Sequence, residues 1–310
     1  MASRRATDHI LRGVGLGREG PGATSGWTEP RVGVLASLYP AVLRTVLFLR
    51  VAPVNRVKER LEAGETVFGT WLQTASLTVA NILAHSGMDF VTVDMEHGPA
   101  SFSEAEAIMY AVEAGGSTPM IRLGDGSGPN VLKACDVGCQ GILVAHVQSA
   151  AEADGIVRAM RFAPDGDRCM APFTRLHGWS SQDLEQKLAD ANRWQLAGIL
   201  VEDRVGLENL DSILEVDGLD LVYLGIYDIS QAIGYPGQVD HPRVLETVSA
   251  AVRRINDAGK TAGAVSRDSD HLKWLLGTGF RYISYLCDTA LITQRARAVR
   301  ADFEEILRDI

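Results

Sequence analysis

Two periodicities of hydrophobic positions alternate along the chain from about residue 54 onward. Short apolar or β-branched runs predict strands. The longer stretches between them, such as SLTVANILAHSG and SEAEAIMYAVEAGG, repeat their apolar positions every three to four residues, and this predicts helices. Several of these helices end at a glycine, as C-caps often do. The predicted strands cover 67–72, 89–94, 118–122, 140–145, 197–202, 220–225, 260–265 and 280–285.

Eight strands that are each followed by a helix predict an α/β fold, the (β/α)₈ or TIM barrel. A doubly wound open sheet is the alternative for the same alternation. The 310 residues suffice for one barrel domain. We assign residues 53–310 to it.

Residues 1–52 have a different composition. They contain seven arginines, three acidic residues and no lysine. We predict disorder for residues 1–30 and an amphipathic helix for residues 34–49. GLGREG (15–20) matches a dinucleotide fingerprint, but no strand precedes it, so we discount it. Pro40, Arg44 and Arg50 interrupt the apolar stretch 32–52, which predicts no membrane span.

Charge and cysteine content exclude some classes of function. The net charge is −9, and the part after residue 52 carries −13. Such an acidic body predicts no nucleic-acid partner. None of the four cysteines forms a C-x-x-C pair, so we predict free thiols, no zinc site and a cytoplasmic location.

Ionisable residues gather where the predicted strands end. The carboxyl ends of barrel strands meet on one face, and this face carries the chemistry of TIM-barrel enzymes. We therefore predict an active site there. Its candidates from five consecutive strands are Asp94, Glu96, His97, Arg122, His146, Glu202 and Asp228.

Glu202 and Asp228 are separated by about one β/α repeat, which places two carboxylates side by side. Such a pair repels unless a cation or a proton lies between them. Oxygen ligands favour Mg²⁺ or Mn²⁺. Neutralisation by an arginine such as Arg204 is the alternative. No lysine follows a predicted strand, which argues against a Schiff-base mechanism.

Three further residues are candidates for substrate contact. The long interval 163–195 is predicted to form a functional loop over the active face. Arg175 in this interval would bind a distal carboxylate or lie on the surface. His146 would touch substrate or be structural. Trp71, at the end of the first strand, is expected to pack in the barrel mouth more than to contact substrate.

Several motifs together resemble one family. VDMEHGP, MIRLG, KACDVGCQGILVAHVQSAAEA, VEDRVGLENLDSIL and YLGIYDISQAIGYPG are similar, in order and spacing, to the metal-dependent (class II) pyruvate aldolases of the HpcH/HpaI family. The resemblance runs from about Val54 to Phe303. It implies a TIM barrel that cleaves 4-hydroxy-2-oxo acids such as 4-hydroxy-2-oxoheptanedioate.

The resemblance also implies roles for individual residues. Glu202 and Asp228 would be the metal ligands. His97 would be the general base, acting through a metal-bound water, with Asp136 orienting it. Arg122 would bind the keto oxygen and the developing enolate, and Asp94 would lie near the metal-bound water. The backbone at Gly225 and Tyr227 would face the pyruvyl carboxylate.

The expected cofactor is a divalent metal, Mg²⁺ or Mn²⁺ with Co²⁺ as a further candidate, and no organic cofactor. The expected partners are a 2-oxo acid, an aldehyde and other copies of this chain. The family is typically hexameric, as a trimer of dimers, with exchanged C-terminal helices. Departures from the family pattern, such as Leu200 and Ala145, leave the acceptor open.

An aldolase is therefore the function that the sequence predicts. Two alternatives share its metal–enolate step: decarboxylation of oxaloacetate and biosynthetic carbon–carbon bond formation. A third alternative is a non-catalytic barrel that acts as a binding partner. The combination of His97, Arg122, Glu202 and Asp228 argues against the third.

Overall fold

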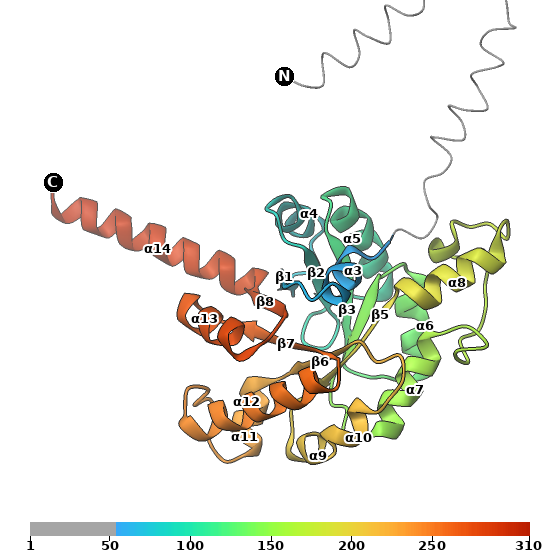
Figure 1. Cartoon of the computed structure of the whole chain (residues 1–310). Helices are drawn as coiled ribbons and strands as arrows, with labels where there is room; N and C mark the ends of the chain where they lie inside the picture. Colours follow the sequence, from blue (N-terminus) through green and yellow to red (C-terminus); the bar gives the residue numbers. More distant parts are fainter. Residues whose placement is uncertain (1–53) are drawn as a thin grey trace, which may run out of the picture. The chain divides into compact units, whose positions relative to one another are not determined.

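Residues 54–310 are described by the computed structural model, and they form a closed barrel of eight parallel strands in sequential order (Figure 1). This confirms the predicted TIM barrel and excludes the open sheet. Each predicted strand agrees with the structure to within two residues. The strands are β1 (Val67–Leu72), β2 (Phe90–Asp94), β3 (Thr118–Leu123), β4 (Gly141–Val144), β5 (Leu196–Val201), β6 (Leu221–Leu224), β7 (Thr261–Ser266) and β8 (Tyr282–Cys287). The expectations for residues 1–52 lie outside the described residues.

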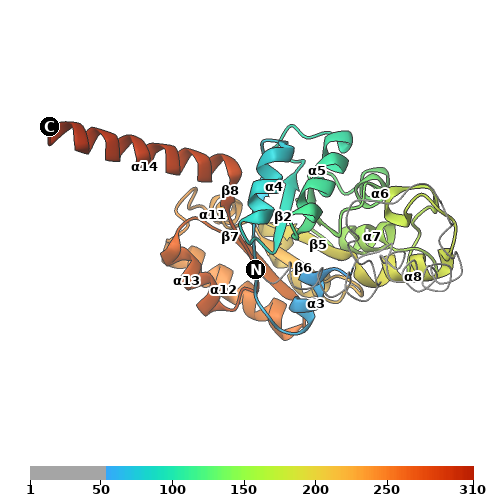
Figure 2. The same cartoon turned by 90° about the horizontal axis from the view of Figure 1, so that it is seen from above.

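Helices surround the barrel and return the chain to the amino ends of the strands (Figure 2). Two of these helices begin with a capping box, as the sequence S-x-x-E favours. In each, a serine side chain pairs with a glutamate three residues later, Glu104 in one and Glu152 in the other. The helices are α3 (Arg56–Glu62), α4 (Leu77–His85), α5 (Phe102–Ala114), α6 (Gly128–Asp136), α7 (Ala150–Met160), α8 (Leu184–Trp194), α9 (Arg204–Glu208), α10 (Leu210–Leu214), α11 (Ile226–Ala232), α12 (Pro242–Asp257), α13 (Ser269–Thr278) and α14 (Asp288–Arg308), with a 3₁₀ turn at Arg175–His177.

Side chains that point into the barrel fill it with large apolar groups. Phe90 and Tyr282 stack with ring centroids 4.1 Å apart. A Cβ at Gly69 would lie 2.5 Å from Phe90 Cδ2, so the glycine in β1 makes room for this ring. Residues of alternate positions pack outward against the helices and form a second apolar layer. The part of the barrel near the amino ends of the strands is therefore a packed core. Space for a reaction remains at the mouth, where the carboxyl ends of the strands meet.

The interval 163–195 does not cover the active face, which corrects the sequence prediction. It follows α7 and leads into β5, so it lies at the amino ends of the strands. Its contacts are all there: Arg168 binds Asp136, and Arg193 pairs with Glu62 of α3. The physical reason is the direction of the chain, because a segment between a helix and the next strand returns to the face opposite the mouth.

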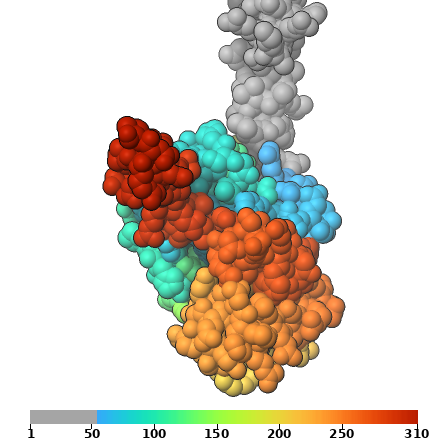
Figure 3. All heavy atoms as spheres, turned by 90° about the vertical axis from the view of Figure 1, so that its left-hand side faces the viewer, coloured from blue at the N-terminus to red at the C-terminus, as the bar shows by residue number. Residues whose placement is uncertain are grey.

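The last helix, α14, extends away from the barrel in two perpendicular views (Figures 1 and 2), and Figure 3 shows the molecule from the side on which this helix ends. Asp288, its first residue, is buried. Apolar side chains farther along are about half exposed, and they include Ile292, Val299, Phe303, Ile306 and Leu307. No helix in residues 54–310 combines the length and the apolar character needed to cross a membrane.

Candidate active site

The mouth of the barrel contains a buried ion pair between β2 and β3. Asp94 and Arg122 are register partners on these adjacent strands. Arg122 donates from Nε to Asp94 Oδ1 at 2.9 Å and from Nη2 to Oδ2 at 2.5 Å. Asp94 is fully buried, and it also accepts hydrogen bonds from the Gln73 side chain and from the backbone N–H groups of Glu96 and His97. This carboxylate therefore fixes both the guanidinium and the chain that follows β2.

The electrostatics keep this pair ionised. Burial raises the pKa of Asp94, but the hydrogen bonds and the charge of Arg122 outweigh it, so the pKa lies below its usual value. Burial lowers the pKa of Arg122, but the hydrogen bonds and the charge of Asp94 raise it by more. The net pKa of Arg122 therefore lies above its usual value. The Arg122 guanidinium also lies 4.4 Å above the Trp71 ring. Trp71 itself is buried and donates to Tyr223, so it packs in the mouth as expected.

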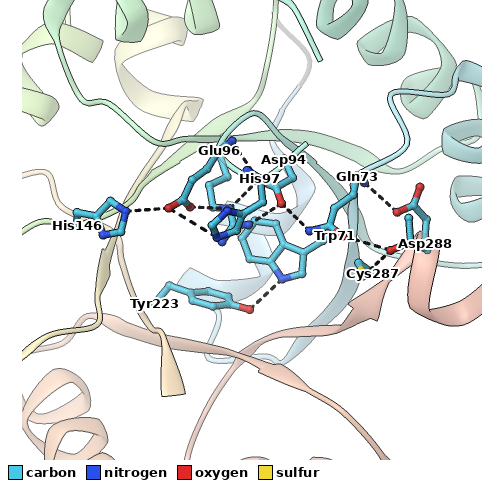
Figure 4. A network of polar contacts seen from close by, with 11 residues as sticks. Trp71, Gln73, Asp94, Glu96, His97, His146, Tyr223, Cys287 and Asp288 are labelled. Atoms are coloured by element: carbon cyan, nitrogen blue, oxygen red, sulfur yellow. Dashed lines mark hydrogen bonds and ion pairs between the residues drawn. The ribbon is translucent and has the colours of Figure 1, made fainter. Parts of the chain in front are cut away.

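A cluster of three side chains lies next to this pair, just after the ends of β2, β4 and β5. His146 Nε2 is 2.9 Å from Glu96 Oε1, and His146 Nδ1 is 2.8 Å from Glu202 Oε1. Figure 4 shows the imidazole of His146 facing Glu96 across the mouth. The ligand atoms of these three residues lie within 4.8 Å of one another, as a metal site requires.

The loop after β6 closes against Glu202. A Cβ at Gly225 would lie 2.6 Å from Glu202 Cβ and 2.7 Å from its Oε2, so only glycine lets the loop approach this closely. Asp228 is exposed on the first turn of α11. Burial raises the pKa of Glu202, and the charges of Glu96 and Asp228 add to this effect. Asp228 is thus near enough to Glu202 for its charge to be felt.

His97 stands at the open edge of the mouth. Its side chain is 66% exposed, and its Nε2 is 3.9 Å from Glu96 Oε1. The backbone of His97 is held by Asp94, but its ring is free to turn toward a molecule in the mouth. Tyr227 is also exposed, on the first turn of α11. The Gly225 N–H donates to the Val201 carbonyl, so it is already used within the barrel.

Two predicted site residues lie away from the mouth in this chain. Asp136 ends α6, near the amino ends of the strands, and accepts from Arg168 at 2.6 Å. Within this chain it therefore does not orient His97. Arg175 pairs with Glu113 and donates to the carbonyls of Val137 and Gly138. The prediction that Arg175 reaches substrate over the mouth does not hold in this chain, because the interval 163–195 lies at the other end.

One residue of the mouth was a candidate without a role, and another was missed. Glu96 was predicted at the mouth beside Asp94 and His97, but no role was assigned to it. The two-residue spacing from Asp94 at the end of a strand could have revealed it, since such residues share a face. Gln73 was missed. It joins Asp94 to the end of β8, where Asp288 accepts from the backbone N–H groups of Gln73 and Thr74 (Figure 4).

The arrangement can stabilise negative charge and hold a cation. Arg122 is balanced by Asp94, which leaves Glu96, Glu202 and Asp228 as further carboxylates around the mouth. Glu96 Oε2 is buried and accepts no hydrogen bond from the described residues. A set of carboxylate oxygens and an imidazole nitrogen suits a divalent metal ion. These features define a TIM-barrel enzyme with a charged, metal-competent mouth.

The chain belongs to the HpcH/HpaI aldolase/citrate lyase family, whose sequence profile matches residues 67–294. It is therefore an enzyme of the aldolase class. It is 35% identical over 255 residues to a hydroxypyruvate/pyruvate aldolase of Roseobacter denitrificans, which covers 82% of this chain and 99% of that protein. It is 34% identical over 253 residues to a 2-keto-3-deoxy-L-rhamnonate aldolase of Salmonella gallinarum, over 81% of this chain and 94% of that protein.

Solved structures agree with this assignment. A family member from Burkholderia cenocepacia J2315 superposes with a TM-score of 0.76 at 26% identity, over 81% of this chain and 99% of that one. The citrate synthase SbnG superposes with a TM-score of 0.73 at 27% identity, over 80% and 97% of the two chains. The same barrel thus supports aldolases and a citrate synthase.

Proposed function

We propose that this enzyme is a divalent-metal-dependent aldolase that cleaves a 4-hydroxy-2-oxo acid to pyruvate and an aldehyde, or adds them in reverse. The observation that carries the proposal is the buried arginine Arg122, clamped by Asp94 beside the cluster of Glu96, His146 and Glu202. The names of the relatives, pyruvate aldolase and keto-deoxy-acid aldolase, support this substrate class.

The reaction needs a base and a site for negative charge. In cleavage, the base removes the proton of the C4 hydroxyl, the C3–C4 bond breaks, and its electron pair forms the enolate of pyruvate. The aldehyde leaves, and the protonated base returns its proton to C3, which gives pyruvate and the free base. His97 is our candidate for the base, because it is exposed at the mouth and imidazole is the side chain that most often serves as a general base. Arg122 would hold the enolate oxygen.

We assign the metal to Glu202 and Asp228, and we take Mg²⁺ or Mn²⁺ as the candidate ions. Two observations support a cation at Glu202: the raised pKa of this buried carboxyl, and the buried Glu96 Oε2 without a donor among the described residues. A divalent ion there would supply positive charge to the keto oxygen. The role of Asp94 is to hold Arg122 and the backbone of His97 in place. The backbone at Tyr227 is the candidate contact for the pyruvyl carboxylate.

Carbon–carbon bond formation is the second candidate function. The likeness to the citrate synthase SbnG favours it, because bond formation can use the same enolate with a different acceptor. Decarboxylation of oxaloacetate would also produce this enolate. These reactions share the enolate and the residues of the mouth. They differ in how the enolate forms and in what it then reacts with.

We further propose that the chain assembles into a homo-oligomer through α14, as a hexamer whose last helices are exchanged between neighbours. The exposed apolar side chains of α14 support this, since a projecting helix with Val299, Phe303 and Leu307 uncovered is a typical contact surface.

Pyruvate release tests the proposed function. Purified enzyme with Mg²⁺ or Mn²⁺ would be given a panel of 4-hydroxy-2-oxo acids and, separately, oxaloacetate, with pyruvate measured by a coupled dehydrogenase. We expect turnover of at least one hydroxy-oxo acid, abolished by Arg122→Gln and unaffected by Arg254→Gln. Arg254 is a matched control because it pairs with Asp211 on the surface. Turnover of oxaloacetate alone would favour the decarboxylase, and wild-type activity in Arg122→Gln would contradict the role of Arg122.

A further inference from the structure

We propose that His146 is itself a metal ligand, together with Glu202 and Glu96, so that the site prefers a transition ion such as Mn²⁺ or Co²⁺ to Mg²⁺. This inference rests on the proposed function, because it concerns the metal of the same site. It goes beyond that function by adding an imidazole nitrogen and a second glutamate to the ligand set.

The distances between the donor atoms carry the first step. His146 Nδ1 is 2.8 Å from Glu202 Oε1, and His146 Nε2 is 2.9 Å from Glu96 Oε1. Neighbouring ligands that each lie about 2.1 Å from an octahedral ion are separated by about 3.0 Å. The observed separations are those of hydrogen bonds from the imidazole, and they also match the spacing of atoms that share a cation; a small turn of the ring would bring one nitrogen to that ion.

The charges of the mouth carry the second step. Glu96 and Glu202 are nearly buried, with 9% and 7% of their side chains exposed. Arg122 lies 3.2 Å from Glu96 Oε2 but directs its hydrogen bonds to Asp94. Arg122 therefore offsets the charge of Glu96 only in part, and a divalent ion would balance the negative charge that remains on Glu96 and Glu202.

The third observation is the strained backbone conformation of His146. Its φ is +61°, in the left-handed region that residues other than glycine rarely adopt. Glu202 Oε1 accepts the His146 N–H at 2.9 Å and holds the residue in this conformation. Such strain is common at functional sites. The side chain is nevertheless 61% exposed, so it is not held there by packing in the core.

The chemistry of the donor set gives the metal preference. Mg²⁺ favours oxygen donors and retains water, whereas imidazole suits later divalent ions. A site made of the carboxylates of Glu202, Asp228 and Glu96 and one imidazole should therefore bind Mn²⁺ or Co²⁺ more tightly than Mg²⁺. If His146 served only as a hydrogen-bonding bridge between the glutamates, this preference would not depend on its nitrogen.

The experiment is pulsed electron paramagnetic resonance of the full-length enzyme loaded with Mn²⁺, which detects ¹⁴N coupled to the ion. Variants His146→Asn and His97→Asn would be compared with the wild type. Asparagine tolerates the left-handed backbone at residue 146. His97→Asn is the matched control, because it removes the other imidazole at the mouth. The affinities for Mn²⁺ and Mg²⁺ would be measured by titration and competition.

We expect ¹⁴N modulation in the wild type and in His97→Asn, and none in His146→Asn. The preference for Mn²⁺ over Mg²⁺ should fall about 10-fold or more in His146→Asn. Bound Mn²⁺ without ¹⁴N coupling in the wild type, or coupling that persists in His146→Asn, would overturn the role of His146 alone. A wild-type enzyme that binds no Mn²⁺ would overturn the metal site of the proposed function as well.

Discussion

Removal of the charge of Asp94 should destabilise the barrel far more than removal of a surface acid. Asp94 is fully buried and receives five hydrogen bonds, two of them from Arg122. In Asp94→Asn the guanidinium would remain buried without its main partner. Breaking a buried ion pair in this way costs about 3–5 kcal/mol. Glu96 lies 3.2 Å from Arg122 Nε and can compensate in part, so we expect about 3 kcal/mol.

The control for this prediction is Asp211→Asn. Asp211 makes an ion pair of 2.7 Å with Arg254, but its side chain is 78% exposed. Exposed pairs contribute about 1 kcal/mol or less. Urea unfolding would give the free energy of unfolding of both variants. In thermal unfolding, Asp94→Asn should lower the melting temperature by roughly 6–12 °C. Equal destabilisation of the two variants would refute the reasoning that the buried pair organises the mouth.

Three further predictions concern the metal, pH and assembly. Gly225→Ala should weaken Mn²⁺ binding, since its Cβ would displace Glu202; unchanged affinity in a titration would contradict this. Stability should fall as the pH drops below about 6.5, because burial lowers the pKa of His177 and His271 while the unfolded chain takes up protons. The urea midpoint should thus fall from pH 7.5 to 5.5, less so in His271→Gln; equal slopes would count against it. Phe303→Glu on α14 should reduce the mass measured by light scattering, and an unchanged mass would argue against assembly through this helix.

Much of the barrel could be predicted because strands and helices leave different periods in the sequence. The run that ends at Asp94 is mostly apolar or β-branched, and its strand begins and ends within a residue of the prediction. The direction of each strand then followed from the fold class. This placed Arg122, His146 and Glu202 on the same face as Asp94, where the structure has them.

Contacts across strands could not be read from the sequence in the same way. The register that pairs Asp94 with Arg122 depends on how the closed barrel staggers its strands. The bridging position of His146 depends on a left-handed backbone, for which the sequence gives no glycine or asparagine as a signal.

Two candidate residues lie away from the mouth of this chain for one physical reason. Arg175 was a candidate for binding a distal carboxylate, with a surface position as the alternative, because long insertions often carry function. Its segment lies between a helix and the following strand, and such segments lie at the opposite face. Asp136, at the end of α6, is near the same face for the same reason. The position of an insertion within the β/α unit was a better guide than its length.

The central claim is that the mouth generates the enolate of pyruvate with the help of a metal. Exchange of the pyruvate methyl protons with deuterium, followed by NMR, measures this step without any knowledge of the acceptor. We expect exchange with Mg²⁺ or Mn²⁺, none with EDTA, and none in His97→Ala, which should still bind metal and stay folded. Wild-type enzyme that binds metal and yet exchanges no protons, or a His97→Ala variant that exchanges at the wild-type rate, would contradict the account.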